Sequence, residues 1–312
     1  MSSIIKSLKG LGGGLKLLFG KLNRMVLEPL LVSPSLHSRK GLTEDLHSAA
    51  GGQNKADHSG TSSGKAGLFS SKSNLQSTSL ALQFLASTLT HMSNVVGLEL
   101  VNEPDNNMEL QGWYERTIAE CRAVAGPDFP IYVSDAWDLQ HYAKWTGGRD
   151  DWVVLDHHLY RCHAEHDQKK SADQHVQEIK SSFGNEFGGH CGAAKGNVVV
   201  GEFSAALNPN SLPKGIPDGE RDRYQREFVW AELEMFERHA AGWWFWTYKK
   251  GEGWDAGWSA KNATQAEILP NWVGSGKFKG PPPSHVKDNA LQEAYGNSSS
   301  FRIASELMSR ST

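Results

Sequence analysis

The sequence predicts an α/β fold in which a parallel sheet is formed by strands that alternate with helices. Short runs rich in Val, Ile and Leu recur between residues 95 and 248, and amphipathic segments of helical length separate them. Two of these runs end at a glutamate, Glu103 and Glu202, and Pro104 follows the first. A buried parallel strand that ends in a polar residue brings it to the carboxyl edge of the sheet, where (β/α)8 barrels hold their active sites. The predicted architecture is therefore a (β/α)8 barrel.

Each predicted element rests on a local pattern. Strands are indicated by apolar β-branched runs, and helices by apolar residues at helical spacing, with Gly126-Pro127 as a stop signal. The predicted strands are 42–47, 95–103, 131–134, 152–158, 198–202 and 243–248. The predicted helices are 74–92, 109–124, 139–145, 171–183 and 220–240, with two more candidates at 286–295 and 301–308. Residues 51–73 are rich in Gly, Ser and Lys and are expected to form a long surface loop.

The strand count falls short of a closed barrel. A (β/α)8 barrel has eight parallel strands, whereas the sequence shows five clear runs and a weaker one at 42–47, where Thr43, Glu44 and Asp45 interrupt the apolar pattern. Residues 25–32 are apolar, but Pro29 argues against a central strand there. We therefore predict a single barrel domain over residues 41–312 that lacks its first two βα units.

Residues 1–40 differ in character from the rest. Up to Arg24 the segment holds several lysines, no acidic residue and a Gly12-Gly13-Gly14 run. A poorly ordered basic tail is favoured over a transit-like or membrane-surface amphipathic segment, and the pattern of a secretory signal is not visible. No run of about 18 apolar residues predicts a membrane-spanning helix.

Composition narrows the class of partner. The formal net charge is −3, which does not resemble a nucleic-acid-binding protein. The chain has 11 Trp, of which seven lie after residue 229, and a tryptophan ring suits the face of a sugar as well as it suits a core. The three cysteines are widely spaced, which argues against a disulfide framework and against a zinc site.

Glu103 and Glu202 are the candidate catalytic residues. In a retaining glycosidase one carboxylic acid protonates the leaving oxygen while a carboxylate about 5 Å away attacks the anomeric carbon. Two strand ends at one barrel mouth can supply this separation. Each glutamate alone could equally be an ordinary rim residue or a helix cap, but a second strand that ends in Gly-Glu-Phe-Ser makes the paired interpretation the better one.

The order of the motifs resembles glycoside hydrolase family 5, and within it the fungal exo-β-1,3-glucanase branch (glucan 1,3-β-glucosidases). The similarity covers residues 44–260. The matching segments are Asp45-Leu46-His47 with Gly51-Gly52-Gln53-Asn54, Leu98–Pro104, His158-Leu159-Tyr160, Gly201-Glu202-Phe203-Ser204 and Trp243–Lys249.

The resemblance implies a role for individual residues. Glu103 would be the general acid/base, Glu202 the nucleophile, and Asn102 a hydrogen-bond partner of the sugar 2-hydroxyl. His158 and Tyr160 would share one face of a strand, with Tyr160 close to the nucleophile. His47 would contact the terminal glucose, Trp246 would be the stacking platform, and Trp254 and Trp258 would extend it. The family's first two strands, including an arginine that supports the nucleophile, have no visible counterpart.

Other polar residues have less specific interpretations. His157, His158, His163 and His166 could be taken for a metal cluster, but His157 and His158 are neighbours on a strand and should point apart. Glu99 shares the parity of Glu103 and is a candidate interior acid. Asp135, Trp137 and Asp138 could line the mouth or form a surface turn. No metal and no organic cofactor are expected.

The leading functional prediction is a retaining hydrolase of β-1,3-glucan or a related fungal cell-wall glucan, acting as a monomer without nucleic acid or stable membrane insertion. The main alternative is an inactive carbohydrate-binding remnant of that family, and a third is a fragment without a ligand. The resemblance implies an extracellular or cell-wall location, whereas the absence of a visible signal leaves the cytoplasm open.

Overall fold

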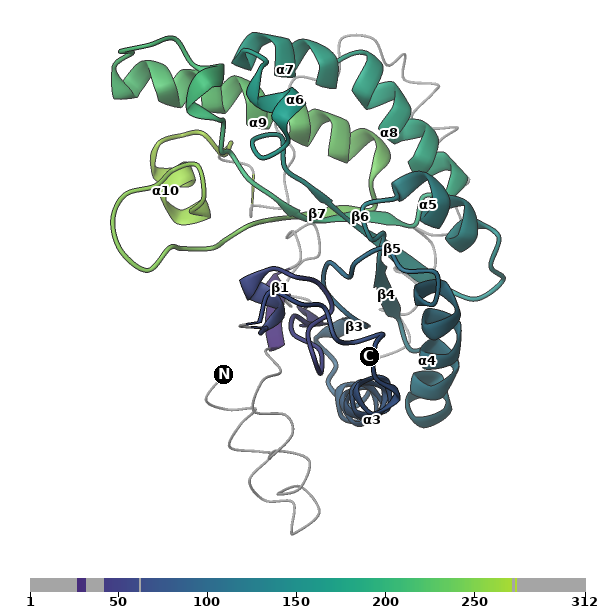
Figure 1. Ribbon diagram of the computed structural model, residues 1–312. Coiled ribbons are helices and arrows are strands. Elements are labelled where there is room, and N and C mark those ends of the chain that lie inside the picture. Colours follow the sequence, from purple (N-terminus) through teal and green to yellow (C-terminus); the bar gives the residue numbers. More distant parts are fainter. Residues whose placement is uncertain (1–26, 32–41, 62, 271–272, 274–312) are drawn as a thin grey trace.

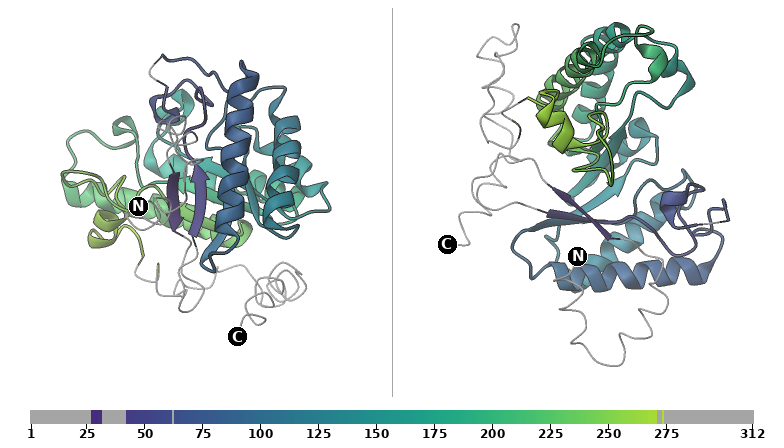
Figure 2. Two further views of the ribbon diagram at one scale, coloured as in Figure 1. Left: turned by 90° about the horizontal axis from the view of Figure 1, so that it is seen from below. Right: turned by 90° about the vertical axis from the view of Figure 1, so that its left-hand side faces the viewer.

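The computed structural model describes residues 27–31, 42–61, 63–270 and 273, which form one seven-stranded sheet with helices along its outer side (Figure 1). The strands lie side by side in sequence order, and β2 to β7 are parallel. The six parallel strands form a curled partial barrel, and Figure 2 shows the curl from two further sides. The predicted fold class is confirmed: this is the strand order of a (β/α)8 barrel without the full ring of strands.

All six predicted strands are present with small changes at their ends. The β3 ladder stops at Glu99, four residues before Glu103, and the last strand stops at Phe245 rather than Tyr248. The strands are β1 (Leu27–Leu31), β2 (Leu42–Leu46), β3 (Val95–Glu99), β4 (Ile131–Ser134), β5 (Val153–Leu159), β6 (Val198–Phe203) and β7 (Gly242–Phe245).

Helices occupy the predicted crossovers between the parallel strands, and one more helix follows the last strand. Their bounds are α3 (Lys72–Leu89), α4 (Leu110–Ala125), α5 (Leu139–Gly147), α6 (Glu165–Gln168), α7 (Ala172–Ile179), α8 (Ser182–Ala193), α9 (Asp218–His239) and α10 (Ala260–Gln265), with short 3-10 turns η1 (Asp57–Ser59) and η2 (Pro209–Ser211). The short helices α6 and α10 were not predicted. Within the described part of the chain, none of the helices is both long and apolar enough to cross a membrane.

The prediction of one helix over 171–183 was wrong, because two helices, α7 and α8, occupy this region. The chain turns at Ser181, whose ψ of −105° is not helical. Gly184 allows the close approach of the two helices, since a Cβ there would lie 2.2 Å from the Ile179 carbonyl oxygen. Helix α8 contains four glycines, which carry a low helix propensity, and this composition hid it in the sequence.

Strand β2 is polar and buried at the same time. Thr43, Glu44 and Asp45 interrupt the apolar pattern, yet all three are at most 5% exposed. Asp45 is paired along the parallel ladder with Glu99 of β3. The weak sequence signal therefore reflects a strand that buries an acid on each of its two faces, Glu44 on one and Asp45 on the other.

The edge beside β2 is formed by β1, which is antiparallel and pairs Pro29 with Glu44 (Figure 2). Proline lacks a backbone donor and is found in sheets at such edges, so the prediction that Pro29 excludes a central strand is confirmed. Apart from β1, the predicted basic segment 1–40 lies outside the described residues. The candidate helices 286–295 and 301–308 also lie outside them.

The first part of the predicted surface loop 51–73 is in fact buried. Gln53 is fully buried: its side-chain oxygen accepts from the Ala49 amide at 3.0 Å, and its nitrogen donates to the carbonyl oxygens of His47 and Asn102, each at 2.9 Å. The loop therefore ties the end of β2 to the segment that follows β3. The composition of this segment, rich in Gly, Ser and Lys, predicts exposure. It gave no sign that a single residue, Gln53, would be buried and would connect the two segments.

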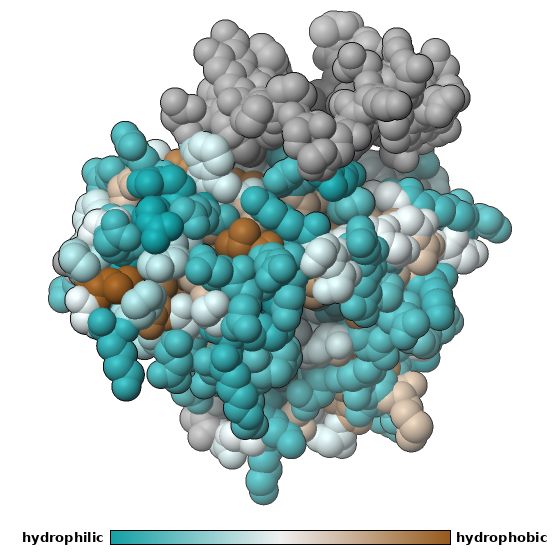
Figure 3. All heavy atoms as spheres, turned by 90° about the horizontal axis from the view of Figure 1, so that it is seen from above, coloured by the Kyte–Doolittle hydropathy of each residue, from teal (hydrophilic) through white to brown (hydrophobic). Residues whose placement is uncertain are grey.

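Apolar residues divide between the two faces of the sheet. Val198, Val200 and Phe203 of β6 face the helices and belong to the main core, where the Phe203 ring lies 5.1 Å from that of Phe236. Val199 points the other way, into the barrel interior, with Val154 and Trp244. The face seen in Figure 3 is largely hydrophilic, with small separate apolar spots.

Glu232 of α9 is expected to lower the stability of the fold at neutral pH. It is fully buried and its carboxylate oxygens have no hydrogen-bond partner among the described residues. Burial raises its pKa well above the usual 4.5, and the charge of Arg161 offsets this only in part. Folding therefore takes up a proton above about pH 4.5, so this glutamate makes stability fall as the pH rises. We expect Glu232→Met to raise the free energy of unfolding at pH 7 by about 1–3 kcal/mol.

Urea denaturation at an acidic and a neutral pH checks this expectation. The gain should be larger at neutral pH than at acidic pH, since the glutamate is protonated in both states at low pH. Glu234→Gln, an exposed position on the same helix, is the control and should change stability little. A Glu232→Met protein that is less stable at both pH values would contradict the assignment of an unpaired buried acid.

Candidate active site

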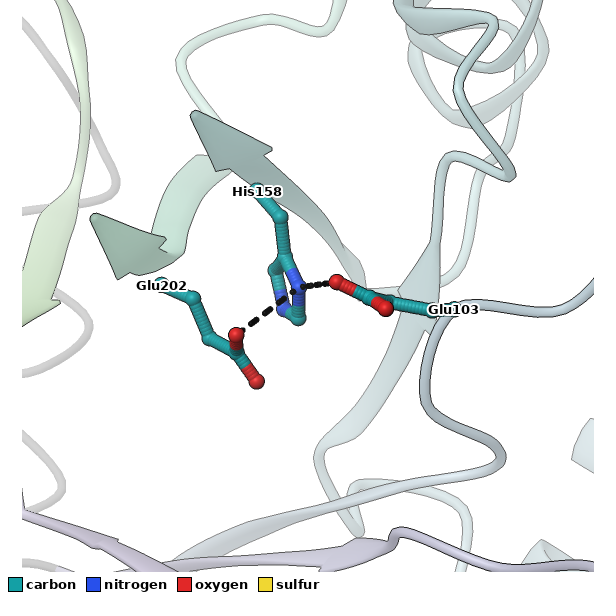
Figure 4. A group of neighbouring side chains, drawn as sticks. All are labelled: Glu103, His158 and Glu202. Carbon is teal, nitrogen blue, oxygen red and sulfur yellow. Dashed lines mark hydrogen bonds and ion pairs between the residues drawn. The ribbon is translucent and has the colours of Figure 1, made fainter. Parts of the chain in front are cut away.

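The carboxyl ends of neighbouring strands bring the predicted site residues together. His47 follows β2, Glu103 follows β3, His158 lies in β5 and Glu202 lies in β6. Figure 4 shows Glu103 and Glu202 pointing toward His158 from opposite sides. Three ligand-type atoms, one from each of Glu103, His158 and Glu202, lie within 4.8 Å of one another. The spatial clustering of these predicted residues is therefore present in the structure.

Glu103 is placed by the segment after β3 rather than by the strand itself. Its φ is +42°, in the left-handed region that non-glycine residues seldom adopt. The Asn54 side-chain nitrogen donates to the Glu103 carbonyl oxygen at 2.8 Å, and the Asn102 amide donates to the Leu46 carbonyl oxygen at 3.2 Å. These contacts hold a backbone conformation of a kind that persists only where the surroundings impose it. Glu103 also lies beyond the end of the β3 ladder at Glu99, so its direction is not set by the alternation of a regular strand.

Glu202 lies in a buried position beside a phenol. The Tyr160 hydroxyl donates to Oε2 of Glu202 at 2.5 Å, and His158 Nδ1 lies 3.5 Å from the same oxygen. Burial raises the pKa of Glu202 to about 7, an effect opposed by His158 and increased by the charge of Glu103. Tyr160 is itself kept protonated, because burial and the Glu202 carboxylate raise its pKa far above the usual value.

Glu103 contacts two histidines. His158 Nδ1 lies 2.7 Å from Oε1, and His58 Nε2 lies 3.1 Å from Oε2. Burial alone would raise the pKa of Glu103, but the hydrogen bonds and charges of His158 and His58 outweigh it and hold the pKa well below its usual value. His58 was not predicted as a site residue, and the only signal for it was its place in the loop 51–73.

The order of the pKa values of Glu103 and Glu202 is opposite to the order that the roles implied by the resemblance require. A general acid must hold a proton before the reaction, whereas the nucleophile must be ionised. Here Glu103 is the more acidic group and Glu202 the more basic one. The arginine expected beside the nucleophile belongs to a strand without a counterpart in the described part of the chain. A positive charge at that place would lower the pKa of Glu202.

Buried acids, Asp45, Glu99 and Asp156, lie beneath the site. Of these, the sequence predicted only Glu99 as an interior acid. Asp156 Oδ1 accepts the Gly201 amide at 2.7 Å, and Oδ2 lies 3.4 Å from His158 Nε2. Asp156 is two residues before His158 on β5, so alternation along the strand was a usable signal. Glu99 is 1% exposed, and burial together with the charges of Asp156 and Asp45 raises its pKa well above the usual value. Glu99 is therefore an interior acid whose surroundings favour its protonated form.

His158 links this layer to the two glutamates. It is 4% exposed, with Asp156 at its Nε2 and both Glu103 and Glu202 at its Nδ1. Burial would lower the pKa of His158, but the charges of Glu202 and Asp156 and the hydrogen bonds to Asp156 and Glu103 raise it well above the usual value. The neighbouring carboxylates therefore favour the protonated form of the ring.

Aromatic rings surround the carboxylates on two sides. His47 and Trp246 are stacked, with ring centroids 5.6 Å apart and planes within 1°, and His47 Nδ1 lies 2.8 Å from Asp45. Trp246 precedes a cis peptide bond to Thr247. The Trp258 ring lies 5.5 Å from Tyr160. Of the predicted platform residues, the structure therefore brings Trp246 and Trp258 to the site.

For three further residues, Trp254, His163 and Trp137, the structure shows whether they lie at the site. Trp254 is 62% exposed and makes no ring contact among the described residues, so the structure does not bring it to the site. His163 stacks on Trp258 at 5.7 Å and touches Tyr160, which places it in the aromatic group. Trp137 is 58% exposed and meets His158 edge-on at 6.4 Å, so this position lies at the mouth.

Among the described residues, the group that could hold a metal ion consists of Glu103, His158 and Glu202, since each offers one ligand atom. His157 is not part of it, because its Nδ1 lies 2.6 Å from Asp135 Oδ2 on the other face of β5. The prediction that His157 and His158 point apart is confirmed. His158 is held by carboxylates at both nitrogens, which suits a protonated ring better than a metal ligand.

The structure is a partial (β/α)8 barrel with two glutamates at the carboxyl edge of its sheet, and glycosidases of this fold use a pair of carboxyl groups at that edge. Comparison with known proteins points the same way. The chain is 28% identical over 252 residues to glucan 1,3-beta-glucosidase 3 of Schizosaccharomyces pombe, covering 79% of this chain and 50% of that protein. It is 29% identical over 241 residues to an uncharacterized glycosyl hydrolase of Saccharomyces cerevisiae, covering 74% of this chain and 46% of that protein.

These comparisons confirm the predicted resemblance to the fungal glucan 1,3-β-glucosidases. The chain spans about half the length of the first two relatives. No family model matches the sequence. Among solved structures, rutinosidase from Aspergillus niger is similar in fold, with a TM-score of 0.54, 19% identity, and coverage of 72% of this chain and 64% of that one.

Proposed function

We propose that this chain is a retaining glycoside hydrolase that cleaves β-glucosidic bonds of β-1,3-glucan or a related fungal cell-wall glucan. The observation that carries the proposal is the pair Glu103 and Glu202, whose carboxylate oxygens lie within 4.8 Å with His158 between them. Carboxyl groups about 5 Å apart fit direct attack on the sugar, whereas inverting enzymes need a wider gap for a water molecule. The similarity to proteins named glucan 1,3-β-glucosidases supports the substrate class.

In the proposed reaction Glu202 attacks the anomeric carbon while the glycosidic oxygen receives a proton from Glu103. The bond to the leaving sugar breaks and an ester to Glu202 forms. Water then attacks the anomeric carbon, Glu103 takes its proton, and Glu202 is released. Asn102 would contact the sugar 2-hydroxyl, and His47, Trp246 and Trp258 would bind the sugar rings. Trp254, which is exposed, remains a candidate only for a more distant sugar unit.

The proposed chemistry has a defined pH dependence. Glu202 has a pKa of about 7 because of its burial, so it is mainly protonated and not nucleophilic in acid. Its ionised fraction rises from about 10% at one pH unit below the pKa to about 90% at one unit above it. Formation of the covalent intermediate should therefore become faster as the pH rises from about 6 to about 8.

The test is the intact mass of the full chain after incubation with a 2-deoxy-2-fluoro-β-glucosyl donor at several pH values. We expect one added fluoroglucosyl group that maps to Glu202, forms faster at the higher pH and is absent in Glu202→Gln. Glu186→Gln, a change at an exposed glutamate of α8, is the matched control and should be labelled like the parent. No adduct on a cooperatively folded protein would refute the hydrolase.

One observation favours a second candidate, an inactive carbohydrate-binding protein. Glu202 has no arginine partner among the described residues and its pKa is about 7, which is high for a nucleophile. The aromatic rings of Trp246 and Trp258 would still bind sugar. Binding of laminari-oligosaccharides in calorimetry without any adduct or release of glucose would establish this alternative. An extracellular or cell-wall location is proposed on the similarity to the glucan glucosidases alone.

A further inference from the structure

We propose that His58 is a second proton-holding group of this site, which passes a proton to Glu103 before the glycosidic bond breaks and takes it back after water attacks. This inference rests on the proposed hydrolase function. His58 lies in the turn η1, and nothing in the chemistry above assigns a role to it. Three features of its surroundings lead to the proposal.

The first feature is its contact with Glu103. His58 Nε2 lies 3.1 Å from Oε2, the carboxylate oxygen that His158 leaves free, because His158 Nδ1 lies 2.7 Å from Oε1. The His58 side chain is 39% exposed, whereas that of His158 is 4% exposed and enclosed by carboxylates. His58 is therefore the histidine through which Glu103 can exchange a proton with water.

The second feature is the Asn54 amide group. Its oxygen accepts the Ala56 amide at 2.8 Å and its nitrogen donates to the Glu103 carbonyl oxygen at 2.8 Å, so its orientation is fixed. The same nitrogen lies 2.9 Å from His58 Nε2. A neutral His58 can accept at Nε2 from Asn54, and a protonated His58 can donate from Nε2 to Glu103. One ring atom thus has a suitable partner in each protonation state.

The third feature is the balance of charges around the ring. The His47 ring, paired with Asp45, lies 5.9 Å from the His58 ring. Beyond Glu103 lie the His158 ring and the carboxylates of Glu202 and Asp156. On its own loop the charged neighbours are Asp57 and Lys55. Acids and bases are thus mixed around the His58 ring, and the charged group in direct contact with it is the Glu103 carboxylate.

The proton balance is simple. A proton moves from His58 Nε2 to Glu103 Oε2, which gives a neutral ring and a carboxylic acid. Glu103 passes this proton to the leaving oxygen as the glycosidic bond breaks and Glu202 forms its ester. Glu103 then accepts a proton from the attacking water and returns it to His58. Such a relay suits a carboxyl group whose pKa is held low by histidines and which therefore holds no proton of its own at rest.

The test compares two substrates that differ in their need for acid. Laminaribiose has a sugar leaving group that must be protonated, whereas 2,4-dinitrophenyl β-glucoside has a leaving group that departs without a proton. We expect His58→Gln, which can still donate to Glu103 but cannot exchange a proton, to lower kcat/KM for laminaribiose by on the order of 10- to 100-fold. The value for the dinitrophenyl glucoside should stay within about twofold, and the pH profile for laminaribiose should lose one ionisation.

His166→Gln removes an exposed histidine whose carboxylate partner is Asp167 and is the control, with no expected change for either substrate. Two results for His58→Gln would overturn the relay. An equal loss of kcat/KM on both substrates would indicate a structural role, and no loss on either would indicate that His58 passes no proton. The fluoroglucosyl donor separates the two proposals. If the parent forms the Glu202 adduct and His58→Gln keeps the parental substrate ratio and pH profile, only the relay fails. If the parent forms no adduct, the hydrolase and the relay fail together.

Discussion

Replacement of Glu202 by glutamine is expected to lower kcat/KM for laminaribiose by on the order of 10⁴-fold or more. The amide keeps the shape of the side chain and can accept from the Tyr160 hydroxyl, which lies 2.5 Å from the carboxylate, but it cannot attack the anomeric carbon. Without the covalent intermediate, the remaining route is direct hydrolysis by water, for which carboxyl groups this close leave no room.

Glucose release from laminaribiose, measured by a coupled assay, checks this expectation. Far-UV circular dichroism and the unfolding midpoint should match the parent, so that a loss of activity is not a loss of fold. Glu186→Gln again serves as the control for a glutamate-to-glutamine change outside the site. A Glu202→Gln protein that keeps activity within about tenfold of the parent would exclude Glu202 as the nucleophile.

Replacement of Glu103 by glutamine is expected to have a second large effect that depends on the leaving group. For laminaribiose, kcat/KM should fall by about 10²- to 10⁴-fold, because general acid catalysis contributes about this much. For 2,4-dinitrophenyl β-glucoside the loss in kcat/KM should be small, since bond cleavage needs no proton there. The Glu202 adduct should then accumulate, because its hydrolysis still needs a base.

Burst kinetics with the dinitrophenyl glucoside and the intact mass during turnover measure both parts of this expectation. The comparison of the two variants also decides the assignment of roles. In the structure Glu103 is the more acidic group, so the reverse assignment is a definite alternative. It predicts that the adduct maps to Glu103 and that Glu202→Gln is the variant whose loss depends on the leaving group.

The sequence predicted the strands of the barrel well because their apolar β-branched runs are set by burial on both faces, as in Val198-Val199-Val200. It predicted β2 poorly, because Glu44 and Asp45 are buried for reasons that depend on neighbouring strands. Helix α8 was missed because of its four glycines, of which Gly184 and Gly188 lie in close contact with neighbouring residues that only the tertiary structure reveals.

The candidate site was predictable where a residue lies on a strand end and not where it enters from a loop. Glu103 and Glu202 were predicted because each stands at the end of an apolar run, which places it at the barrel mouth, whereas His158 was predicted only through the resemblance to the glycoside hydrolase family. His58 was not predicted, because its contact with Glu103 depends on how the loop after Gln53 folds back. The protonation pattern also escaped, since it follows from burial and from which histidine touches which carboxylate.

In the motif around Glu202, Gly201 is required by packing, whereas Glu202 is proposed for chemistry. A Cβ on this glycine would lie 2.2 Å from an oxygen of Asp156, whose other oxygen accepts the Gly201 amide. Every side chain larger than hydrogen would thus displace the acid beneath His158, whether or not the protein turns over sugar. Natural selection for the fold alone would therefore preserve Gly201, while position 202 could hold glutamine as well as glutamate, because an amide can also accept from the Tyr160 hydroxyl. Among natural variants of this chain, a glutamate kept beside that glycine would mark selection for chemistry.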